Sequence, residues 1–217
     1  MSARDFVVKP LSAIPPDAKL GWEPILGEDG QVVGFRNPRV MSVTRVGMFE
    51  GDQFKYDLCT IEDGPQDENG IATPGVMLVP IREVGLKLFM VGALREWRPV
   101  VRDPLTGKMG VEIIGLPGGF AKKAGQKPED VASYQGLSEM GIEVKEVIPL
   151  GQATANRAYI PTCIRYFAVK YRVVGEAKPE GLESIIGTEE ILLSEFPLGL
   201  DGIVNTAIAF AWQYFGM

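Results

Sequence analysis

One stretch of the chain, residues 116–142, constrains the fold more than any other. An apolar run ends in Pro117-Gly118-Gly119, a loop follows, and a segment that starts at Pro128 stops at Gly141. Proline suits the first turn of a helix, acidic residues suit its positive end, and glycine suits its C-terminal cap. The stretch therefore predicts a strand, a glycine-rich loop and a helix over residues 128–140. Such a loop can approach an anion closely, although a plain strand-to-helix connection has the same pattern.

The rest of the chain reads mainly as strands. Apolar and β-branched runs predict them at residues 22–26, 32–35, 40–49, 54–61, 76–81, 86–91, 111–116, 144–150, 162–174 and 190–193. A charged loop is expected over 175–187 and a closing helix over about 201–214. Strands and helices in this irregular order indicate an α+β fold rather than a repeated βαβ series.

Composition excludes several kinds of chemistry. The chain has no histidine, so it cannot hold a Ser-His-Asp or Cys-His catalytic site or a zinc site built on histidine. Its two cysteines, Cys59 and Cys163, do not indicate a disulfide scaffold. A net charge of −6 gives no broad attraction to nucleic acid or anionic membranes, and no apolar run is long enough for a membrane span. We expect a cytoplasmic protein with neither of these partners.

Residues 116–142 resemble the Nudix box, G-x5-E-x7-R-E-U-x-E-E-x-G-U, in which U is a bulky aliphatic residue. Pro117-Gly118-Gly119 is similar to the family's PGG turn, residues 125–132 to its GE-x-PEE-AA run, and residues 138–142 to its EE-x-GU ending. The loop between Gly119 and Gln126 is one residue longer than the pattern. Residues 91–100 resemble the LVRQYRP segment of ADP-ribose pyrophosphatases, and residues 201–207 resemble their closing helix.

The resemblance covers roughly residues 20–215 and implies the Nudix fold. In that fold a mixed β-sheet is sandwiched between helices (α/β/α), and the ADP-ribose pyrophosphatases add an N-terminal antiparallel β region. We therefore expect residues 1–72 to form an N-terminal extension and hairpin region, and residues 73–217 to form the Nudix domain. Family members of this type dimerise through their N-terminal strands, so a homodimer is implied.

The family's catalytic residues are mostly replaced. Members use box carboxylates on one helical face to hold Mg²⁺ or Mn²⁺ against a pyrophosphate. Here the corresponding positions carry Gln126, Tyr134, Gln135, Gly136 and Ser138, and Glu139 alone remains acidic. Gln135 and Glu139 are four residues apart and share a helix face. A single carboxylate is a poor ligand set for a hard divalent cation.

Individual roles follow from the resemblance. It implies that Glu139, Gln135 and Gln126 occupy the catalytic positions. Glu139 would be a weak metal ligand, and Glu112 is a candidate for a second ligand. Other carboxylates that could replace the lost ones are Glu96 and Glu189 or Glu190. Phosphate groups would be held by Arg95, Arg98, Gly118 and Gly119, and a base would stack on Trp97 or Tyr159.

Three functions remain open from the sequence. The first is Nudix-type hydrolysis of a nucleoside diphosphate-linked compound, of the ADP-ribose or nucleotide-sugar class, with Mg²⁺ or Mn²⁺. The second is binding of a nucleotide-like small molecule without catalysis and without a metal. The third is an interaction scaffold built on the same fold.

Overall fold

The computed structural model describes residues 23–37, 41–63, 73–156, 160–178, 185–199 and 201–216. These residues form two β-sheets, two α-helices and a short 3-10 helix, η2 (Leu193–Glu195). No helix in these ranges is both long enough and apolar enough to cross a membrane. Tyr159, one of the two candidates for base stacking, lies outside the described residues.

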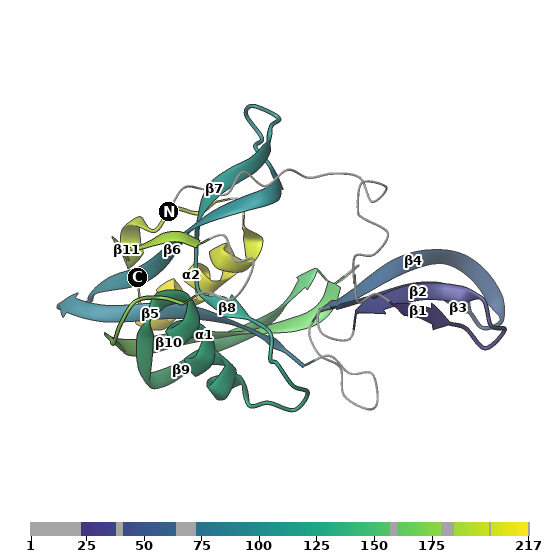
Figure 1. Cartoon of the computed structure of the whole chain (residues 1–217), viewed down its shortest axis with the longest axis horizontal. Helices are drawn as coiled ribbons and strands as arrows, with labels where there is room; N and C mark the ends of the chain where they lie inside the picture. Colours follow the sequence, from purple (N-terminus) through teal and green to yellow (C-terminus); the bar gives the residue numbers. More distant parts are fainter. Residues whose placement is uncertain are drawn as a thin grey trace.

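The N-terminal sheet is antiparallel, and its strands follow one another in chain order. It contains β1 (Glu23–Leu26), β2 (Val32–Asn37), β3 (Met41–Glu50) and β4 (Gln53–Asp63). Gly30 and Gly51 take positive φ angles of 75° and 58° in the β1–β2 and β3–β4 turns, a conformation that glycine adopts without strain. Figure 1 shows this sheet as an arm that extends from the part of the molecule holding both α-helices. The predicted N-terminal antiparallel region is confirmed.

The larger sheet is mixed. Its strands are β5 (Gly75–Gly85), β6 (Leu88–Arg102), β7 (Met109–Gly115), β8 (Gly118–Gly119), β9 (Ile142–Asn156), β10 (Ile160–Val173) and β11 (Ile185–Leu192). The order is β11-β6-β5-β10-β9, with β7 beside β6 and β8 beside β5. Strands β5 and β10 run parallel, and the other pairs are antiparallel.

The two α-helices cover opposite faces of this sheet. Helix α1 (Pro128–Met140) buries Val131 and Ala132 in a cluster that includes Leu78 of β5. Helix α2 (Gly202–Phe215) lies in a second cluster, which includes Val79, the next residue of β5. Neighbouring residues of a strand point to opposite faces, so the two clusters lie on the two sides of the sheet, here called the α1 face and the α2 face. The predicted α/β/α sandwich of an α+β protein is confirmed (Figure 1).

Several strand boundaries differ from those expected. Strand β6 continues to Arg102, far beyond the predicted end at residue 91, because its second half pairs with β7 and β11. Strand β11 begins at Ile185, inside the predicted charged loop. The two residues of β8 were not predicted as a strand, since their extended conformation comes from pairing with β5. The predicted helix over 128–140 has the observed bounds of α1, and Gly141 caps it with a φ of 65°.

Candidate functional site

The glycine turn and helix α1 meet at one side chain. Glu139 is 5% exposed, and its Oε2 accepts a hydrogen bond of 3.1 Å from the backbone N–H of Gly118. A Cβ at Gly118 would lie 2.7 Å from the carbonyl oxygen of Val76, so strand β8 can sit this close to β5 only with glycine there. The Glu139 carboxylate therefore fixes the turn to the helix.

Gln135 occupies the space above the second glycine. It is 9% exposed, and a Cβ at Gly119 would overlap its side-chain amide nitrogen. Four of the predicted site residues, Gly118, Gly119, Gln135 and Glu139, are thus brought together as the motif implies. The group holds one carboxylate and one neutral amide.

Gln126 takes part in the loop that precedes α1. Its side-chain oxygen accepts a hydrogen bond of 3.1 Å from the backbone N–H of Lys122. The ammonium group of Lys122 donates to the Tyr134 hydroxyl at 2.6 Å and lies 3.9 Å from the centre of its ring. Two residues at positions where the Nudix pattern has Glu and Arg, Gln126 and Tyr134, therefore contribute to the order of the loop.

The two candidate arginines point to different faces of the sheet. A Cβ at Gly92 of β6 would touch Met140 of helix α1, whereas Ala93 lies in the cluster of α2. Strand β6 keeps a regular register with β7 from residue 94 to residue 98. By alternation, Arg98 lies on the α1 face with Glu139, and Arg95 lies on the α2 face.

Arg95 is engaged with Glu112. Its Nε donates to Glu112 Oε1 at 2.8 Å, and its Nη2 donates to the same oxygen. These hydrogen bonds, followed by the charge of Glu112, raise the pKa of Arg95 above its usual value. Glu112, the candidate second metal ligand, therefore lies with Arg95 on the face of the sheet opposite Glu139.

Glu96 is the second buried carboxylate on the α1 face. It is 7% exposed and forms an ion pair of 2.6 Å with Arg98. A Cβ at Gly115 would overlap its carboxylate, so this glycine makes room for Glu96 as Gly118 does for the Val76 carbonyl. Segment 115–118 thus has a buried carboxylate at each end. From the sequence, Glu96 was one of several carboxylates that could replace the missing metal ligands. Gly115, which leaves room for the Glu96 carboxylate, was the sequence signal that could have distinguished it from the others.

The late carboxylates have other surroundings. Glu190 accepts a hydrogen bond from Arg82 Nη2 at 2.5 Å and another from the Tyr171 hydroxyl at 3.0 Å. The hydrogen bond from Arg82 lowers the pKa of Glu190. Glu189 is half-buried on β11 and acts electrostatically on Arg95.

The donor set does not fit a hard divalent cation. Within the described ranges, no three His, Cys, Asp or Glu side chains are grouped so that they could hold a metal ion. Mg²⁺ and Mn²⁺ prefer several oxygen ligands, with carboxylates to offset their charge. At the turn, Glu139 is the one charged ligand, and it already accepts a hydrogen bond from Gly118.

Trp97, the described candidate for base stacking, is packed within the β6–β7 hairpin. A Cβ at Gly110 would overlap its indole ring, and Gly110 has a φ of 87°. One face of the ring is thus covered by the facing strand, and the side chain is half-buried. This placement gives Trp97 a packing role in the hairpin.

Comparison with known proteins identifies the fold. No family model and no curated protein matches the chain. A solved structure described as an ADP compounds hydrolase matches 91% of this chain and 92% of its own, with a TM-score of 0.55 and 14% identity. A MutT Nudix hydrolase from Burkholderia pseudomallei matches 63% of this chain and 95% of its own, with a TM-score of 0.45 and 16% identity. The first likeness shows that this chain has a Nudix-like α+β fold.

Proposed function

We propose that this chain binds a nucleoside diphosphate-linked compound at residues 117–127 and the start of helix α1, without metal-assisted hydrolysis. One observation carries the proposal: Glu139, the last acidic side chain of the box, is buried and accepts the Gly118 N–H. A neutral amide, Gln135, lies over Gly119 in place of a second carboxylate. The turn is similar in sequence to the family's pyrophosphate-binding turn but carries less negative charge.

The charge of the preceding loop supports an anionic ligand. Lys122, Lys123 and Lys127 all lie in this loop and are exposed. Lys127, the N-cap of α1, makes no side-chain hydrogen bond to the first helical turn, which also carries Glu129 and Asp130. The N–H groups of Asp130 and Val131 already donate to the Lys127 carbonyl, so the support for a phosphate ligand comes from the lysine ammonium groups. Lysines can offset phosphate charge that a metal ion neutralises in the family.

Calorimetry with ADP-ribose in EDTA tests the proposal. We expect binding in EDTA, little change when Mg²⁺ replaces EDTA, and full recovery of intact ADP-ribose by chromatography. Lys123→Ala should weaken binding about tenfold, because it removes a charge-assisted contact. Lys108→Ala, at an exposed lysine in the β6–β7 hairpin, is the matched control. Absence of binding in a folded preparation, or cleavage of ADP-ribose that requires Glu139, would overturn the proposal.

A second candidate function is hydrolysis of a nucleoside diphosphate-linked compound at the same turn. The position of Glu96 favours it, because this residue adds a second carboxylate near the turn. This buried carboxylate lies on the α1 face, at the other end of segment 115–118 from the contact between Gly118 and Glu139. Incubation with ADP-ribose, nucleotide sugars, dinucleoside polyphosphates and nucleoside triphosphates, with Mg²⁺ or Mn²⁺, tests it. Turnover that is lost in both Glu96→Gln and Glu139→Gln, and kept in Glu112→Gln on the other face, would establish it. No turnover in a folded preparation would exclude it for these substrates.

We also propose that the N-terminal sheet forms a homodimer contact, as the family resemblance implies. Leu26, Val32 and Phe35 of β1 and β2 are 60%, 54% and 53% exposed, and such apolar side chains gain free energy when a partner covers them. Light scattering should give twice the chain mass, and Phe35→Lys should give a monomer. A monomeric wild type would contradict this proposal without affecting ligand binding.

A further inference from the structure

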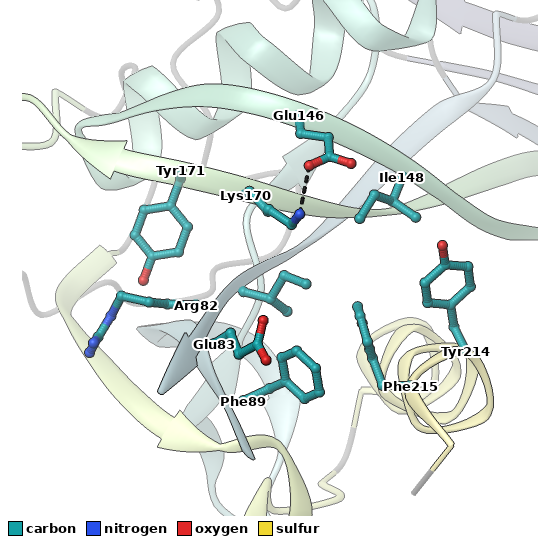
Figure 2. A pocket seen from close by; sticks show the side chains of 10 residues that line it. Arg82, Glu83, Phe89, Glu146, Ile148, Lys170, Tyr171, Tyr214 and Phe215 are labelled. Atoms are coloured by element: carbon teal, nitrogen blue, oxygen red, sulfur yellow. Dashed lines mark ion pairs between the residues drawn. The ribbon is translucent and has the colours of Figure 1, made fainter. Parts of the chain in front are cut away.

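A cavity of about 490 Å³ lies between the sheet and the C-terminal end of α2. Phe89 of β6 and Tyr214 and Phe215 of α2 form its aromatic wall (Figure 2). The rings of Phe89 and Phe215 are 4.5 Å apart between centroids, and those of Tyr214 and Phe215 are 5.0 Å apart. Three neighbouring rings at one wall can attract a cation through their negative π-faces.

Glu83 and the aromatic wall lie on the α2 face, whereas Arg82 and Tyr171 line the cavity from the other face, and no lining residue belongs to the glycine turn. Ile81, which lines it, belongs to the cluster of α2, and Glu83 follows two residues later on the same face of β5. Glu139, on helix α1, belongs to the α1 face. A ligand in this cavity would therefore not contact the turn at residues 117–127.

The cations that line the cavity already have carboxylate partners. Lys170 forms an ion pair of 2.8 Å with Glu146, the residue opposite it on β9 (Figure 2). Arg82 forms its ion pair with Glu190, which is outside the lining. Because both cations are paired with carboxylates, neither Lys170 nor Arg82 provides an unbalanced positive charge that would attract an anionic ligand.

Glu83 supplies the surplus charge. Its exposed carboxylate forms no hydrogen bond or ion pair with any residue in the described part of the chain, although its charge reaches Lys170 and raises the pKa of that lysine, after the larger effect of Glu146. Figure 2 shows the Glu83 side chain projecting beside Phe89 into the space that Phe215 borders. The cavity therefore combines an aromatic wall with one carboxylate that has no partner of its own.

We propose that this cavity binds a small organic cation, of the ammonium or quaternary ammonium class, between Glu83 and the rings of Phe89, Tyr214 and Phe215. The carboxylate balances the charge of the ligand, and the rings replace part of its hydration. The volume exceeds that of a single metal ion and falls within the range of small-molecule sites.

Choline and its neutral carbon isostere, 3,3-dimethylbutan-1-ol, are suitable probes because they differ in charge and hardly in shape. Titration of the full chain, followed by amide chemical shifts, should show choline binding with shifts centred on residues 81–89 and 214–215. The neutral isostere should bind at least about tenfold more weakly. Equal affinities for the two probes, or no binding of choline by the folded chain, would overturn the proposal.

Two variants locate the charge effect and the ring effect. Glu83→Gln keeps the shape and should weaken choline binding about tenfold, while affinity for the isostere stays unchanged. Phe215→Leu should weaken both probes. Glu195→Gln, at an exposed carboxylate outside the cavity, is the matched control and should bind choline as the wild type does. Unchanged choline affinity in a folded Glu83→Gln variant would overturn the assignment.

Discussion

The Oε2 atom of Glu139 lies 3.1 Å from the backbone nitrogen of Gly118 and joins helix α1 to strand β8. The same carboxylate would be a metal ligand in the Nudix pattern, and here it holds a turn in place. This structural role gives the first prediction, which is independent of any ligand.

Replacement of Glu139 should cost stability according to what remains to accept the Gly118 N–H. Glu139→Ala leaves this half-buried group without its acceptor and should lower the free energy of unfolding by about 2 kcal/mol. Glu139→Gln keeps an acceptor oxygen and should cost about 1 kcal/mol. Urea unfolding measures both. Glu129→Ala, at an exposed position of α1, is the control, and equal losses in all three variants would contradict the role of the hydrogen bond.

Gly118→Ala should destabilise the chain even though the backbone can accept alanine. The added Cβ would lie 2.7 Å from the Val76 carbonyl oxygen, and a strand backbone cannot move aside as a flexible side chain can. We expect a loss of about 1–3 kcal/mol in unfolding free energy and a weaker β8–β5 pairing. Gly187→Ala in β11 is the matched control, because a Cβ there meets no atom within 4 Å. Similar stability of the two variants in chemical denaturation would refute this reading.

Stability should fall at acidic pH partly through Glu190. The hydrogen bond from Arg82 lowers the pKa of Glu190 in the folded chain, so its contribution is present above the unfolded value of about 4.3. The contribution is lost as pH falls through the lower folded pKa. Unfolding curves between about pH 5 and pH 3 should therefore show a shallower pH dependence in Glu190→Gln than in the wild type. An unchanged slope in Glu190→Gln would show that the ion pair with Arg82 contributes nothing to the pH dependence.

The cap of α2 offers a local test. Asp201 Oδ1 accepts hydrogen bonds from the backbone nitrogens of Ile203 and Val204 at 2.8 and 3.2 Å. Asp201→Ala should lower the melting temperature and cost about 1 kcal/mol, whereas Asp201→Ser, which restores an acceptor, should recover most of the loss. Thermal unfolding followed by circular dichroism measures both. An alanine variant as stable as the serine variant would mean that water replaces the cap.

Much of the fold was predictable because local patterns and tertiary contacts agree. Pro128 and Gly141 set the ends of α1, and the strands of the N-terminal arm begin and end near their predicted positions. Strand β6 was predicted too short, because its second half is extended by pairing with β7 and β11 rather than by a continuous apolar run. The two residues of β8 have no strand signal of their own.

The candidate site was predictable in part for the same reason. The motif spacing places Gly118, Gly119, Gln135 and Glu139 together, since a helix repeat fixes which of its residues share a face. The helix repeat could not show that Arg95 and Glu112 lie on one face of the sheet and that Arg98 and Glu96 lie on the other. Those outcomes depend on which face each helix covers and on the register between β6 and β7.

By itself, the sequence determined the order of strands and helices, the ends of α1 and the single carboxylate, Glu139, among residues 134–139, because these depend on residue type and short-range spacing. Tertiary structure alone decided that Glu139 holds the turn, that Glu96 is buried against Gly115, and that Glu83 lies beside an aromatic wall built from β6 and α2. The residues of these contacts come from different elements, and only packing of the sheet against its helices brings them within reach.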